Sequence, residues 1–187
     1  MKPRTLLTTS LTSIAVIALA GSSVAQAPAR GSAAKGATRT PSFEVDATLA
    51  QLMKGTLYPA SNVVFAAQGE SPADVPPEKD PSAALNPLAS AYGKWQAVEN
   101  AGLAMTEVAN LLLLPGRKCS NGKPVPIDNP DWTKFVQGLR GAGLAAYKAA
   151  QSKNQDNILM AADTLTTACA NCHDKYREKT NLADRCQ

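Results

Sequence analysis

Histidine is the scarcest informative residue of this 187-residue chain and occurs once, as His173. Among four cysteines, Cys169 and Cys172 are close together, whereas Cys119 and Cys186 lie far apart. Cys119 and Cys186 therefore form no second closely spaced pair of the kind that a structural zinc site usually needs. The sequence also lacks a Ser-His-Asp constellation, a pair of catalytic carboxylates and a phosphate-binding loop. These absences argue against a hydrolase or a kinase, and we expect that the protein is not an enzyme.

Charge and hydrophobicity exclude two further classes of protein. The formal net charge is +4, and it falls to +2 without Lys2 and Arg4, with no basic stripe elsewhere. We therefore expect no binding to nucleic acid. No long apolar run follows residue 27, so a transmembrane segment is not predicted in that part of the chain.

The N-terminus has the features of a secretory signal peptide. Lys2 and Arg4 precede a short apolar stretch at 11–20, and small residues at Ala25 and Ala27 provide cleavage sites. We predict a signal peptide over 1–27, with an uncleaved anchor as the alternative. Residues 28–41 lack bulky apolar side chains and are predicted to be a disordered leader. The folded domain is expected over 42–187.

The motif that decides the chemistry is Cys169-Ala170-Asn171-Cys172-His173. Cys-x-x-Cys-His is the attachment sequence of c-type haem: two thiols form thioethers with the vinyl groups, and the histidine ligates the iron. A redox disulfide is one alternative, but a thioredoxin-like pair would follow a strand, and no strand pattern precedes this one. The main alternative is a chance match to the motif in a haem-free chain. Because the chain has one histidine, a second one cannot complete the iron from the opposite side.

Hydrophobic periodicity predicts four helices and no strands. The first is expected over 43–68 with a break at Pro59, and the second from Asn86-Pro87, or alternatively Asp80-Pro81, to Pro115. The third opens at Asn129-Pro130 and the fourth at 154–157. We predict an all-α fold, an antiparallel up-down-up-down four-helix bundle with covalently bound haem.

The predicted inward faces contain many small residues. The second helix has a stripe of Leu88, Tyr92, Trp95, Val98, Gly102, Met105, Ala109 and Leu112; the third has Trp132, Phe135, Val136, Leu139, Gly143 and Ala146; the fourth has Ile158, Ala161, Ala162, Leu165, Ala168, Cys169, Cys172 and Tyr176. Gly141 is also expected to face inward. Either a haem fills the remaining volume, or the small residues let helices pack closely.

The segment from Cys169 to Arg177 resembles the cytochrome c-prime family, the class II cytochromes c, which carry Cys-x-x-Cys-His-x-x-Tyr-Arg/Lys on their fourth helix. Segments 52–59 and 110–115 are similar to a c-prime-like subgroup. The resemblance implies a periplasmic four-helix haem protein, often a homodimer, with Arg177 as the basic residue beside His173. Some members bind NO or CO at five-coordinate iron, whereas others have a methionine on the first helix and transfer electrons.

Met53 is the candidate for the sixth iron ligand. In an up-down-up-down bundle, His173, about ten residues before the expected end of the fourth helix, lies at the depth of Leu49 to Met53 on the first. A methionine ligand would raise the reduction potential. Alternatively, Met53 only packs in the core, and Leu49 and Leu52 cap an open iron.

The two remaining cysteines, Cys119 and Cys186, follow the second and fourth helices, which end at the same end of such a bundle. An oxidising compartment favours a disulfide between them. Unpaired thiols and a bridge between two molecules are the alternatives.

One-electron transfer by a periplasmic haem c protein, with redox proteins as its partners, is the predicted function. Haem attachment to this motif is completed outside the bacterial cytoplasm, so the signal peptide and the motif agree. A five-coordinate protein that scavenges or senses NO or CO is the first alternative. A haem-free helical structural module is the second.

Overall fold

The computed structural model describes residues 43–186, so the predicted signal peptide and leader lie outside the described residues. Within that range the chain forms helices and loops but no strand, apart from an isolated bridge between Lys118 and Pro124. The predicted all-α fold is confirmed. Over the same residues, no helix has both the length and the apolar character that crossing a bilayer requires.

The first helical segment begins at Leu49, later than the predicted start at Phe43. Thr48 Oγ1 accepts a hydrogen bond from the Gln51 N–H at 3.2 Å, and Gln51 Oε1 accepts one from the Thr48 N–H at 2.8 Å. This reciprocal capping box satisfies two N–H groups and sets the start of the helix. The segment continues without a gap through α1 (Leu49–Leu52), the π-helical turn η1 (Met53–Leu57) and α2 (Tyr58–Gly69).

The break expected at Pro59 takes the form of the π-helical turn. Proline has no N–H and its ring crowds the preceding turn, so a regular α-helix cannot continue through it without loss. The Tyr58 N–H bonds to Met53 O, one residue further back than in an α-helix. Pro59 then lies in the first turn of α2, where its missing N–H is tolerated.

The second long helix, α3 (Lys94–Leu111), starts later than either predicted start. Asp80 and Asn86 do cap helices, but each opens a single 3₁₀ turn, η2 (Pro81–Ala83) and η3 (Pro87–Ala89). The chain then folds back, with the Gly93 N–H donating to Ser90 O at 2.9 Å. Tyr92 was therefore wrongly placed on the buried stripe and is 70% exposed. The stripe itself is buried from Trp95 to Leu112.

The helices α4 (Pro130–Ser152) and α5 (Gln155–Tyr176) begin as predicted. Asn129 and Asn154 cap them by accepting hydrogen bonds from the N–H groups of Asp131 and Asn157 at 3.0 and 3.1 Å. Between the helices the chain reverses at Lys153, which is left-handed with φ 51°. Because α5 ends at Tyr176, His173 lies much nearer the helix end than the predicted ten residues.

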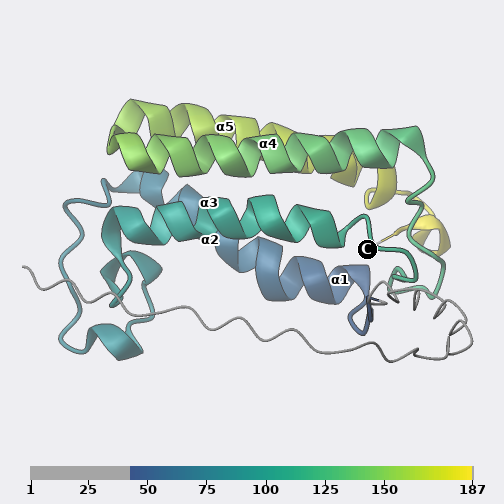
Figure 1. Cartoon of the computed structure of the whole chain (residues 1–187), viewed down its shortest axis with the longest axis horizontal. Coiled ribbons are helices and arrows are strands. Elements are labelled where there is room, and N and C mark those ends of the chain that lie inside the picture. Colours follow the sequence, from purple (N-terminus) through teal and green to yellow (C-terminus); the bar gives the residue numbers. More distant parts are fainter. Residues whose placement is uncertain (1–42, 187) are drawn as a thin grey trace, which may run out of the picture. The chain divides into compact units, whose positions relative to one another are not determined.

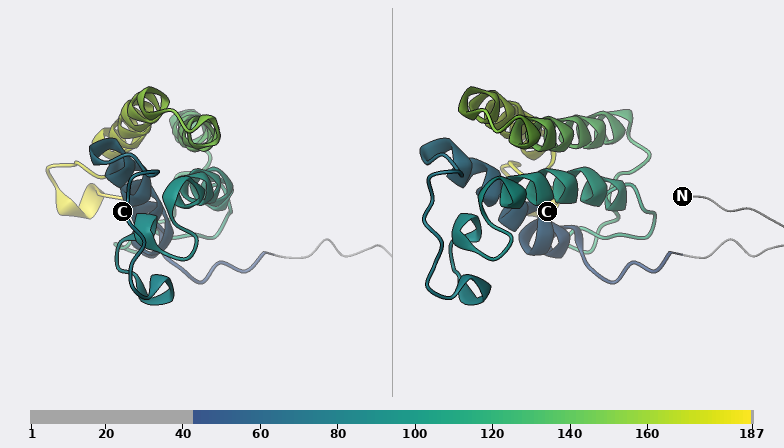
Figure 2. Two further views of the ribbon diagram at one scale, coloured as in Figure 1. Left: turned by 90° about the vertical axis from the view of Figure 1, so that its left-hand side faces the viewer. Right: turned by 60° about the vertical axis from the view of Figure 1, so that its left-hand side comes forward.

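The helices lie side by side along much of their length (Figure 1). α3 packs along α4, α4 along α5, and α2 contacts both α3 and α5. A view along the helices shows them around a shared interior (Figure 2). Since the connection between α4 and α5 is so short, these two helices are antiparallel neighbours.

Two glycines allow α3 and α4 to approach closely. A Cβ on Gly102 would lie 2.6 Å from Tyr147 N and 2.8 Å from Gly143 O, and one on Gly143 would lie 2.7 Å from Thr106 Oγ1. Close packing by small residues is therefore present at this crossing. Gly141 was wrongly expected to face inward, and it is exposed. Residues two positions apart lie on nearly opposite sides of a helix, so Gly141 faces away from α3 while Gly143 faces it.

Gly143→Ala should lower the free energy of unfolding by roughly 1–3 kcal/mol, because its methyl group must displace backbone of α3. The matched control Gly141→Ala lies on the same helix with nothing within 4 Å of the new Cβ. It should raise the free energy by about 0.5–1 kcal/mol, since alanine favours the helix. Urea unfolding measures both. Similar effects of the two substitutions would contradict the close approach.

Candidate cofactor site

The Cys-x-x-Cys-His motif occupies the last turns of α5. Helical neighbours three residues apart share a face, so Cys169 and Cys172 lie together with His173 beside them. All three side chains are half-buried, and the two cysteines are not bridged. The helix ends just after the motif, where the N–H groups of Arg177 and Glu178 both donate to His173 O at 2.8 Å.

The motif forms part of the lining of an apolar cavity of about 430 Å³. Its other lining residues come from η1 and α2, from the end of α3 and from α4, and include Met53, Leu57, Leu112, Trp132, Phe135, Val136 and Leu139. The few polar groups include Lys54 and Tyr58, which are exposed and mark the solvent side. This size and polarity are typical of a cofactor site, for which volumes of roughly 300–1,000 Å³ are usual.

The three candidate haem-pocket residues on the first helix lie in different surroundings. Met53, carried by η1, lines the large cavity and also a smaller one of about 30 Å³ that shares Cys172 and His173. Leu49 lines only the smaller cavity, and Leu52 is buried in the core outside the lining of both. Met53 and His173 thus share the same cavities, although the predicted distance of His173 from the helix end was wrong.

Burial keeps the thiols and the imidazole in their uncharged forms. Desolvation raises the pKa of Cys169, although Arg177 opposes this, and it raises the pKa of Cys172 to about 11 with a contribution from Cys169. The pKa of His173 is lowered by desolvation and then by Arg177, against the smaller opposite effects of Glu178 and Asp174. At neutral pH the site therefore presents two S–H groups and a neutral imidazole, whose free lone pair can ligate a metal.

Arg177 lines both cavities together with His173. Its Nε forms an ion pair with Glu178 Oε1 at 2.6 Å. The side chains of the pair are 44% and 48% exposed, so solvent screens the charge of the guanidinium.

Tyr176, the last residue of α5, lines the smaller cavity. Its ring packs edge-to-face on Trp132 and Phe135, with centroids 5.0 and 6.2 Å apart. Its hydroxyl is buried and has no hydrogen-bond partner within residues 43–186. It is the one orphaned polar atom among the described residues that line the smaller cavity.

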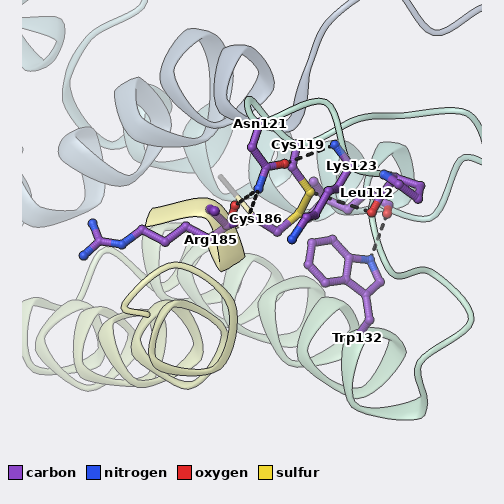
Figure 3. The surroundings of a disulfide bond; sticks show 9 residues. Leu112, Cys119, Asn121, Lys123, Trp132, Arg185 and Cys186 are labelled. Atoms are coloured by element: carbon purple, nitrogen blue, oxygen red, sulfur yellow. Dashed lines mark hydrogen bonds between the residues drawn. A yellow bond between two sulfur atoms is a disulfide. The ribbon is translucent and has the colours of Figure 1, made fainter. Parts of the chain in front are cut away.

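A disulfide joins Cys119 and Cys186, whose Cα atoms are 4.8 Å apart, and this confirms the predicted pairing. Figure 3 shows how it ties the loop after α3 to the tail after α5. Asn121 Nδ2 reinforces the link by donating to Ala183 O at 3.0 Å and to Arg185 O at 2.7 Å. For a sequence separation of 67 residues, the chain-entropy estimate of the stabilisation is about 4 kcal/mol.

No family model matches the chain, and neither the curated proteins nor the solved structures contain a match. Among residues 43–186, no three or more His, Cys, Asp or Glu side chains gather as a metal ion would require. The function is therefore argued from the cavity and the motif.

Sequence analysis missed most of the cavity lining. Trp132, Phe135, Val136 and Leu139 were predicted as the buried face of α4 but not as part of a site. One signal was present: the bulky residues of that stripe occupy the first half of the helix, and Gly143 and Ala146 follow. Leu57 carried no such signal, because its position on the wall depends on the π-helical turn.

Trp132→Phe should lower the free energy of unfolding by about 1–3 kcal/mol. The indole Nε1 donates to Leu112 O at 3.0 Å, and phenylalanine would leave this carbonyl buried without that donor. Trp95→Phe is the control, because Trp95 is 9% exposed and its indole donates no hydrogen bond within the described range. Thermal unfolding of both variants tests this, and an equal loss of stability would count against the role of the bond.

Proposed function

We propose that this chain is a c-type haem protein of the cytochrome c-prime kind that carries single electrons. In this proposal its four helical segments form an antiparallel up-down-up-down bundle around the haem. One observation carries the proposal: Cys169, Cys172 and His173 line the same apolar cavity as Met53.

The residues present suit haem in size, polarity and chemistry. The cavity of about 430 Å³ has the volume of a cofactor site and a mostly apolar lining, as a porphyrin requires. Cys169 and Cys172 are unbridged and carry the spacing that two vinyl groups need. His173 is half-buried beside them and would be the proximal ligand.

Haem supplies a one-electron couple, because its iron alternates between the ferrous and ferric states. The chain would contribute attachment through Cys169 and Cys172 and an imidazole ligand from His173. Trp132 and Phe135 supply aromatic surface to the lining of the cavity. Arg177 would disfavour the extra positive charge of ferric iron, and its pairing with Glu178 weakens this effect.

The proposed location is the periplasm, and the proposed partners are redox proteins of that compartment. The signal sequence over 1–27 supports export. The Cys119–Cys186 disulfide is of the kind that persists in an oxidising compartment. The proposal of a homodimer rests only on the resemblance to the cytochrome c-prime family.

Protein isolated from the periplasm of a host that can attach haem should be red. Its haem should resist acid-acetone extraction, because thioethers survive this treatment. Cys169→Ala combined with Cys172→Ala should abolish covalent haem, as measured by pyridine haemochrome spectra of denatured protein. Cys119→Ala combined with Cys186→Ala is the control for loss of two cysteines and should keep covalent haem. A colourless wild-type protein would support the haem-free module instead.

Binding of NO or CO is the second candidate function. The cavity wall around Met53 is apolar, with Leu57 buried beside it and Leu112 and Val136 on facing elements. Without ligation by Met53, the sixth position would face apolar side chains, which suits a diatomic gas. Both functions use the same cavity. They differ in whether the thioether sulfur of Met53 ligates the iron.

Met53→Leu should convert the ferric protein from low spin to high spin and make the ferrous protein reactive with CO. The wild type should also show the weak far-red band of sulfur ligation, and the variant should lose it. Met105→Leu is the control, because Met105 is 1% exposed and lies in the core. A wild-type protein that is already high-spin and binds CO would favour the gas-binding function.

A further inference from the structure

The four cysteines lie at one end of the molecule but have different fates. Cys119 and Cys186 form a disulfide, whereas Cys169 and Cys172 are free. Cys186 and Cys172 nevertheless line the same cavity of about 30 Å³. One cysteine of the bridged pair and one of the free pair are therefore in contact with a shared space.

Backbone contacts place Cys186 against the helix that carries the motif. The Cys186 N–H donates to Tyr176 O at 2.8 Å, and Tyr176 follows Cys172 by about one helical turn on α5. Cys169 lines only the large cavity, and Cys119 lines neither. Cys172 and Cys186 are thus the pair from which a wrong bridge would form.

We infer that the Cys119–Cys186 disulfide protects the haem-attachment thiols, because it occupies the sulfur of Cys186 that would otherwise be available to Cys172. This inference rests on the proposed function. A thiol can add to a vinyl group: its S–H bond and the carbon–carbon π bond break as a carbon–sulfur bond and a carbon–hydrogen bond form. A disulfide has no S–H group and cannot add in this way, so a Cys172–Cys186 bridge would prevent attachment at Cys172.

The wrong bridge needs an oxidant, and a disulfide of the thiol-oxidising machinery of the compartment, or oxidised glutathione in vitro, can supply it. Cys172 and Cys186 each lose a hydrogen as their S–S bond forms. The two electrons and two protons convert the oxidant's disulfide to two thiols.

Contacts beside the native bridge favour the correct partner for Cys186. Asn121 holds the carbonyls of Ala183 and Arg185 on the segment before Cys186, as Figure 3 shows. Lys123 pairs with Asp184 at 3.3 Å, but both side chains are well exposed, so this ion pair adds little. Asn121 is therefore the positioning residue for the pairing.

The test compares Cys119→Ser, Cys186→Ser and the double variant as full chains made in a host that attaches haem. All three lose the same disulfide and its stabilisation, but only Cys119→Ser leaves a Cys186 thiol beside Cys172. Covalent haem per polypeptide is measured by pyridine haemochrome, and disulfides by peptide mapping without reductant. We expect Cys119→Ser to lose most of its haem and to contain the Cys172–Cys186 bridge. The other two should keep several-fold more haem.

Growth of Cys119→Ser with a membrane-permeant thiol reductant should restore its haem. Asn121→Ala keeps all four cysteines and can be tested if the serine variants do not fold. A fraction of its molecules should contain the Cys172–Cys186 bridge. The control Lys123→Ala should contain none. Equal haem in Cys119→Ser and Cys186→Ser, without the Cys172–Cys186 peptide, would overturn the inference. Absence of covalent haem in the wild type would instead refute the proposed function, and peptide mapping would still decide the bridge.

Discussion

The short segment after α3, from Leu112 to Cys119, holds the other walls of the cavity in place. Arg117 Nη1 donates to Ala47 O at 2.6 Å, and the Leu49 N–H donates to Lys118 O at 2.8 Å, so the start of α1 is bound to this segment. Leu112 O accepts the indole N–H of Trp132 at the start of α4. Cys119 carries the disulfide to the tail beyond α5. That Met53 and His173 line the same cavity depends on these connections between distant parts of the chain.

Arg117 is an unusual component of that segment, because it is a cation that is 5% exposed. Desolvation lowers the pKa of its guanidinium, which still remains protonated since its ordinary value is so high. No carboxylate pairs with it within the described residues; its Nε donates to Leu111 O at 3.2 Å, near the C-terminal end of α3. The partial negative charge of a helix C-terminus favours a cation there and offsets part of the desolvation cost. Substituting Arg117 would therefore loosen both α1 and α3.

Close helix packing explains the small core positions of the α3–α4 crossing. Along the α3–α4 crossing, Gly102 and Gly143 serve close helix packing, and no space remains there. Toward the end that carries Cys169 and His173, bulky side chains surround about 430 Å³ instead. The close packing and the cavity therefore lie at different levels of the same structure. Met53 also lies in a π-helical turn. Such turns are often found at functional sites.

Local sequence signals determined the helical class, the caps of α4 and α5 and the position of the motif on the last helix. These features depend on periodicity and on side chains that bond to nearby backbone. The pairing of Cys119 and Cys186 was predicted from the order of the helices along the chain. Tertiary structure decided the rest. Asn86 caps only one 3₁₀ turn, and the buried Leu88 and Ala89 of that turn pack against α2 and α3. Leu52 lies outside the cavity while Leu57 lines it. Such choices depend on contacts between segments far apart in the chain, which no local pattern encodes.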